Sequence, residues 1–65
     1  MTGTILRTTM IGGLIADARG GRWLFAWRDA IDFRPNDVGS GNKVAFSPGE
    51  TRGTKQFALS VRRND

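Results

Sequence analysis

The chain of 65 residues contains no cysteine and no histidine. These absences exclude disulfides, the common zinc ligand sets, and both Ser-His-Asp and Cys-His nucleophilic sites. No segment approaches the ~18 consecutive apolar residues that a membrane-spanning helix needs, and the start of the sequence lacks the pattern of a signal peptide. The six acidic residues form no recognisable catalytic pair. We therefore expect a cytoplasmic protein with no membrane association, no metal, no cofactor and no enzymatic activity.

Positive charge is abundant. Lysine and arginine number 10 against 6 acidic residues, which gives a net charge of +4 and a pI near 11.2. Eight of the ten cations are arginine. The arginine side chain binds phosphate through two hydrogen bonds and stacks on bases. A small basic domain of this kind is typical of nucleic-acid binding. The same charge is also what keeps many small proteins soluble.

The length allows one small domain, residues 1–65, with a short polar tail at 62–65. Nine glycines and two prolines interrupt the sequence, and no window shows a helical repeat of apolar residues. The interruptions leave short segments of strand-like composition. These segments are residues 4–9, 14–16, 23–28, 43–46 and 57–61.

The connections between these segments contain residues that are typical of turns and loops. Residues 18–22 contain a Gly-Gly pair and predict a hairpin. Residues 28–32 predict one helical turn with Asp29 as its N-cap. Residues 32–42 and 47–55 are expected to be loops. Five short strands favour an all-β barrel, because a closed barrel leaves few exposed edges; an SH3-like barrel is an alternative.

Five segments, at residues 3–8, 10–15, 24–31, 41–46 and 58–61, match the motifs of one family in order and spacing. Through them the chain resembles the bacterial cold-shock domain. The first ribonucleoprotein motif of that family, Lys-Gly-Phe-Gly-Phe-Ile, is matched by Met-Ile-Gly-Gly-Leu-Ile at 10–15. The second, Val-Phe-Val-His-Phe followed by Ser-Ala-Ile, is matched by Leu-Phe-Ala-Trp-Arg-Asp-Ala-Ile at 24–31. The remaining matches are residues 3–8, 41–46 and 58–61.

The resemblance implies a five-stranded antiparallel OB-fold barrel. It also implies sequence-tolerant binding of single-stranded RNA or DNA, in RNA handling or gene regulation in bacteria. Nucleobases in this family stack on exposed aromatic rings, and several of those rings are absent here. The matching positions hold Arg7, Thr8, Gly12, Leu14 and Arg28, whereas Phe25 is retained and Trp27 replaces a histidine.

The orientation of the third segment decides what its aromatic residues do. Trp23, Phe25 and Trp27 alternate, so they share one face of a strand. From the residues alone that face is the core, because large aromatics are mostly buried. The cold-shock register implies the reverse, with Phe25 and Trp27 outward, and this is our prediction. The residues predicted to point inward are Ile5, Ile15, Leu24, Ala26, Ile31, Val44, Phe46, Leu59 and Val61.

The predicted binding surface combines the aromatic residues of this segment with nearby arginines. Its residues are Arg7, Arg19, Arg22, Trp23, Phe25, Trp27 and Arg28. An alternative function is a protein-interaction module that has lost nucleic-acid binding and uses the same face against a partner protein or in a homodimer. Flanking arginines would favour nucleic acid, whereas flanking Leu6, Met10 and Leu14 would favour a protein partner.

Overall fold

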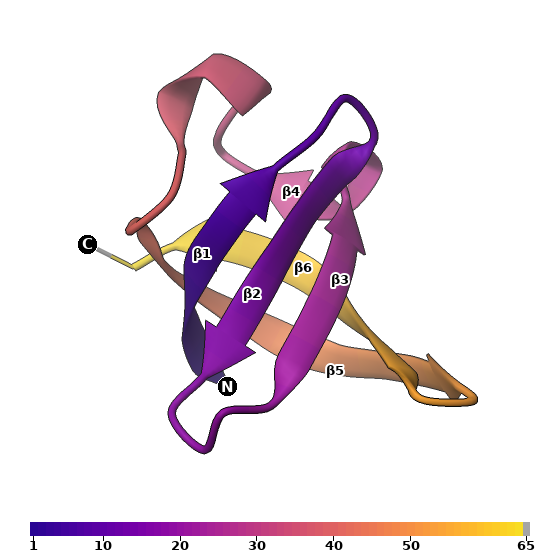
Figure 1. The fold of residues 1–65 in the computed structure, drawn as a ribbon. Helices are drawn as coiled ribbons and strands as arrows, with labels where there is room; N and C mark the ends of the chain where they lie inside the picture. The colour runs from indigo at the N-terminus through magenta and orange to yellow at the C-terminus, as the bar shows by residue number, and fades with distance from the viewer. Residues whose placement is uncertain (65) are drawn as a thin grey trace.

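The computed structural model describes residues 1–64, and its regular structure is mainly β-strand (Figure 1). Two short 3-10 turns, η1 (Trp27–Asp29) and η2 (Pro35–Asp37), interrupt the strands. The strands are β1 (Thr2–Thr8), β2 (Gly12–Asp17), β3 (Arg22–Ala26), β4 (Ala30–Ile31), β5 (Lys43–Arg52) and β6 (Lys55–Arg63).

The strands form one sheet that closes on itself. Its order is β3-β2-β1-β5-β6-β4, and an additional pairing between β3 and β6 joins the two sides. Five strands thus make a closed β-barrel, and the two-residue β4 lies against β6 as an extra strand (Figure 1). The prediction of an all-β barrel is confirmed.

The predicted antiparallel barrel is confirmed only in part, because the sheet is mixed. The four pairs β1–β2, β2–β3, β1–β5 and β5–β6 are antiparallel, but β3 and β6 are parallel, as are β4 and β6. The reason is geometric. Around a ring with an odd number of strands, directions cannot alternate throughout, so a five-stranded barrel with four antiparallel pairs must close through a parallel one.

The core fills the inside of this barrel. Five of the residues predicted to point inward are buried there, namely Ile5, Ile15, Val44, Phe46 and Val61. The remaining buried residues are Trp23, Phe25, Phe33 and Ala58. Half-buried Trp27, Ala30 and Val38 pack against this cluster.

The predicted orientation of β3 is wrong. Trp23 and Phe25 point into the barrel with 7% and 4% of their surface exposed, whereas Leu24 and Ala26 are half-buried on the other face. The pairing with β2 sets this orientation, because Phe25 lies directly opposite Gly13. A glycine leaves the space above it empty, and the ring of Phe25 occupies that space.

The Gly12-Gly13 pair therefore allows close packing between β2 and β3. A Cβ added at Gly13 would lie 2.6 Å from Cε1 of Phe25. One added at Gly12 would collide with the main-chain carbonyl of Phe25. Both positions need a residue without a side chain so that β2 and β3 can approach closely.

The predicted inward position of Leu59 is also wrong, because β6 contains a β-bulge. Ser60 has a φ of 51°, and the pairing with β5 shifts by one residue beside it. An extra residue in a strand reverses the faces that follow it. Ala58 and Val61 consequently point inward, while Leu59 is 42% exposed. Ile31, also predicted inward, is only half-buried in β4.

The segment predicted as a loop at 47–55 is mostly a hairpin. β5 and β6 run to Arg52 and Lys55, and the hairpin they form projects beyond the barrel (Figure 1). Pro48 is tolerated because β1 pairs with β5 only from Lys43 to Ala45, so the outer edge of β5 needs no donor there.

The helical turn predicted at 28–32 is shorter and begins earlier, at Trp27. No side chain caps η1, and Asp29 is its last residue instead of its N-cap. Within residues 1–64, no helix is long and apolar enough to span a membrane.

The close approach of β2 to β3 generates a stability prediction. Gly12→Ala should destabilise the fold by about 1–3 kcal/mol or more, because the added methyl group meets main-chain atoms that cannot move independently. Gly39→Ala is the control, since a Cβ there meets nothing within 4 Å; it should be neutral or stabilising. Urea unfolding followed by tryptophan fluorescence measures both. Equal stability of the two variants would contradict the packing role of Gly12.

Candidate functional site

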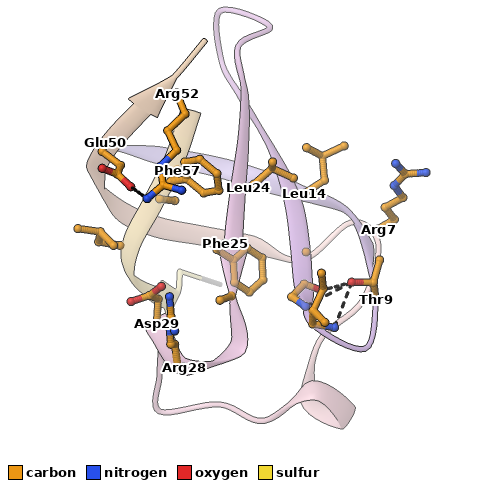
Figure 2. A pocket seen from close by; sticks show the side chains of 16 residues that line it. Arg7, Thr9, Leu14, Leu24, Phe25, Arg28, Asp29, Glu50, Arg52 and Phe57 are labelled. Carbon is orange, nitrogen blue, oxygen red and sulfur yellow. Dashed lines mark hydrogen bonds and ion pairs between the residues drawn. The ribbon is translucent and has the colours of Figure 1, made fainter. Parts of the chain in front are cut away.

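A surface groove of about 830 Å³ crosses the outer face of the barrel (Figure 2). Strands β1, β2 and β3 form its floor, the β1–β2 loop borders one end, and the β5–β6 hairpin borders the other. It is the larger of the two pockets described for residues 1–64. We take it as the candidate site.

A row of paired residues runs along this groove. Arg7 of β1 lies opposite Leu14 of β2, which lies opposite Leu24 of β3, which in turn pairs with Phe57 of β6. Directly paired residues point to the same face of a sheet. Figure 2 shows the four side chains side by side, with Arg7 and Phe57 at opposite ends. The floor is thus apolar in the middle, with an arginine at one end and an aromatic ring at the other.

The hairpin end of the groove carries a charged pair above an aromatic ring. The guanidinium carbon of Arg52 lies 6.0 Å from the centre of the Phe57 ring. The same guanidinium forms an ion pair with Glu50, with Nη2 and Oε1 separated by 2.6 Å (Figure 2). Phe57 is half-buried, whereas both charged side chains are exposed.

The opposite end is shaped by a tightly bonded loop. The hydroxyl of Thr9 accepts hydrogen bonds from the main-chain N–H groups of Ile11 and Gly12, both at 3.3 Å. Trp27 braces this loop, because its Nε1 donates to the carbonyl oxygen of Thr9 at 2.8 Å. Ile11, which lines the groove, and its neighbour Met10 are 82% and 97% exposed.

Charge around the groove is mixed. Arg7, Arg28 and Arg52 line it, as do Asp29 and Glu50, so the cations exceed the acids by one. Arg28 and Asp29 come from η1, which turns the chain at the end of β3 (Figure 2). The arrangement presents arginines at several points around an apolar floor.

The structure brings three of the seven predicted site residues to this groove. Arg7, Phe25 and Arg28 line it. Phe25 contributes only the small part of its ring that the core leaves exposed. Trp27 does not line the groove, and its ring makes edge-to-face contacts with Phe25 and Phe33. It is therefore a support for the site and no part of its lining.

Trp23 is a structural residue. Its ring packs against Phe46, with ring centres 5.2 Å apart, and its Nε1 donates to Oδ2 of Asp17 at 2.9 Å. The other carboxylate oxygen of Asp17 accepts from the main-chain N–H groups of Arg19 and Gly21. These hydrogen bonds lower the pKa of Asp17, with the Trp23 indole as the largest contributor. Asp17 thus ties the β2–β3 turn to the core.

The remaining two predicted residues lie elsewhere. Arg19 and Arg22 are exposed at the β2–β3 hairpin, and neither lines the groove. Arg22 is held at its main chain, where its carbonyl oxygen accepts from Nε2 of Gln56 at 3.1 Å. The predicted cluster of arginines around exposed tryptophans is therefore divided between two parts of the molecule.

The sequence analysis did not predict Leu24 and Phe57 as part of the groove floor. Leu24 was expected inside, and Arg52 and Phe57 were not proposed as site residues. The outward position of Leu24 could have been predicted from the hairpin. The main-chain hydrogen bond from Asp17 N–H to the carbonyl oxygen of Gly21 sets the register that places Leu24 opposite Leu14. No local signal exists for Phe57, because its neighbour Leu24 is distant in sequence and pairs with it in parallel.

Among residues 1–64, no three histidine, cysteine, aspartate or glutamate side chains gather into a group that could hold a metal ion. Comparison with known proteins adds no assignment: no protein-family model and no curated protein matches the chain.

The hydrogen bonds of Asp17 predict how stability depends on pH. Because its pKa is lower in the folded protein, ionised Asp17 stabilises the fold above its unfolded pKa. This contribution should be lost as the pH falls through that value toward the lower folded pKa. Trp23→Phe removes the main donor, so its free energy of unfolding should fall less steeply with acid than that of the wild type.

Urea unfolding at a series of values between about pH 5 and pH 2 measures this dependence. Asp17→Asn serves as the reference, because it removes the titrating group altogether. If wild type and Asp17→Asn lose stability in parallel over this range, Asp17 has no such role.

Proposed function

We propose that the groove binds single-stranded nucleic acid, RNA or DNA, with little sequence preference. The observation that carries this proposal is the position of the groove. It lies on the β2–β3 face, between the β1–β2 loop and the hairpin of the last two long strands. OB-fold barrels bind oligonucleotides and oligosaccharides at this same place.

We further propose that the barrel is of the OB class and related to cold-shock domains. The neighbouring order β5-β1-β2-β3 is that of a Greek key, in which a fourth strand returns beside the first. OB barrels are five-stranded Greek-key barrels. The resemblance at 10–15 supports the same assignment. A role in RNA handling or gene regulation in a bacterial cytoplasm would fit this relationship.

The chemistry of the groove favours a charged, extended ligand. Arginines at its ends and side can hold phosphates, while an apolar floor accepts the flat faces of bases. A neutral oligosaccharide offers no negative charge for these arginines. Leu14 and Leu24 give the floor aliphatic contacts, whereas a base stacked on an aromatic ring is worth ~1–3 kcal/mol. Binding should therefore be weaker than on an aromatic surface and more dependent on charge.

One observation favours a protein ligand as the second candidate. Met10 and Ile11 are exposed next to the leucine floor, so the apolar surface continues from the groove onto the β1–β2 loop. Exposed apolar patches of this kind often bind proteins. A partner protein or a second copy of the chain would then occupy the groove in place of nucleic acid.

The dependence of binding on salt tests the proposal. With three arginines contacting phosphates, the slope of log K against log salt should be about −2, from roughly −0.7 per contact on single strands. Arg7→Gln should reduce the slope by about 0.7. Arg34→Gln, which changes an exposed cation beside η2 and outside the groove, should leave the slope nearly unchanged. Fluorescence anisotropy of a labelled hexathymidine or hexauridine measures the binding.

Labelled oligonucleotide is preferable to intrinsic fluorescence, because neither tryptophan lines the groove. Absence of binding at low salt would contradict the nucleic-acid proposal. Concentration-dependent self-association that Leu24→Glu abolishes would then support the protein-binding alternative.

A further inference from the structure

We propose that Phe57 and Arg52 form a subsite for a single nucleobase and that Glu50 competes with the ligand for Arg52. The inference rests on the proposed function and deepens it. It assigns base stacking to the β5–β6 hairpin, at two residues outside the set that the sequence predicted. It also assigns to Glu50 an inhibitory contact in the free protein.

The spacing between the two side chains is close to what a base requires. Stacked bases are separated by about 3.4 Å, so a base held between two flat groups needs about twice that distance. The guanidinium carbon of Arg52 lies 6.0 Å from the centre of the Phe57 ring. This distance is slightly shorter than a base needs, so Arg52 would move outward to admit one. Guanidinium planes and phenyl rings both stack on bases.

The two sides of this subsite differ in exposure: Phe57 is half-buried and Arg52 is exposed to solvent. Phe57 is half-buried and paired with Leu24 at the parallel closure of the barrel, so its ring is held in place. The Arg52 side chain is 73% exposed on a hairpin that projects from the barrel (Figure 1). A base can therefore enter from the solvent side by displacing only Arg52.

Glu50 holds Arg52 in the free protein. Their ion pair is short, at 2.6 Å, but the Glu50 side chain is 63% exposed. Ion pairs between exposed side chains contribute little net stability. A phosphate next to the stacked base can thus replace the carboxylate as the ligand of Arg52. This exchange keeps the guanidinium paired in both states and weakens binding by the small amount that the ion pair contributes.

The subsite separates the stacking role of Arg52 from its charge. Lysine keeps the charge but lacks the flat group. Arg52→Lys should bind hexathymidine several-fold more weakly than wild type, with an unchanged salt slope. Phe57→Leu keeps an apolar side chain at the barrel closure and should weaken binding about 5- to 30-fold, also without changing the slope. Glu50→Gln should bind up to about fivefold more tightly, because it frees Arg52.

Lys55→Gln is the matched control. It removes a cation from the same hairpin that does not line the groove, so its affinity should stay within twofold of wild type. Urea unfolding of each variant accompanies the titrations. Arg52 and Glu50 are exposed, so their variants keep the test decisive even if Phe57→Leu is poorly folded.

The outcomes separate this inference from the proposed function. If wild type binds no oligonucleotide in low salt, the proposed function fails and the subsite fails with it. If wild type binds but Arg52→Lys and folded Phe57→Leu bind equally well, only the subsite is overturned. If those two variants bind weakly but Glu50→Gln is no tighter than wild type, the competing role of Glu50 is overturned.

Discussion

The contact between Phe25 and Gly13 determines what the barrel presents to solvent. The ring of Phe25 fits over a residue without a side chain, and this fit fixes which face of β3 is inside. Once Phe25 points inward, Trp23 must follow, and Leu24 must point outward. The core therefore takes two large aromatic rings from this strand, and the outer face of β2 and β3 receives leucines. The chemistry of the groove is thus a consequence of how the interior is filled.

The parallel closure of the barrel completes the groove. A ring of five strands needs one parallel pair when its other pairs are antiparallel, and here that pair joins β3 to β6. The closure sets Phe57 beside Leu24 and carries the β5–β6 hairpin to the end of the groove (Figure 2). An aromatic ring and an arginine from the end of the chain thereby join a surface formed by its first half.

The parts of the fold that follow from alternation alone could be predicted from sequence. Ile5, Ile15 and Val44 are buried as their segments indicated, because nothing disturbs the strand period before them. The failures lie where one residue breaks the period or a distant pairing intervenes. The positive φ of Ser60 turned Leu59 outward. Gly13 lies opposite Phe25 and lets its ring point inward, so the two faces of β3 are the opposite of those predicted from the cold-shock register. Of the candidate site, Arg7 and Arg28 were predictable as exposed cations, whereas its aromatic end depends on tertiary pairing.

The projecting part of β5 has an open edge to which strands of other molecules could add in concentrated solution. Beyond the residues that pair with β1, this strand has β6 on one side and an open edge on the other. Open edges invite strands of other molecules to add to the sheet. Pro48 removes a donor from this edge, and the shift in pairing between Pro48 and Thr51 bends it. Glu50 and Arg52 add charge to the same short stretch. These features make the open edge of the projecting hairpin a poor template for strands of other molecules.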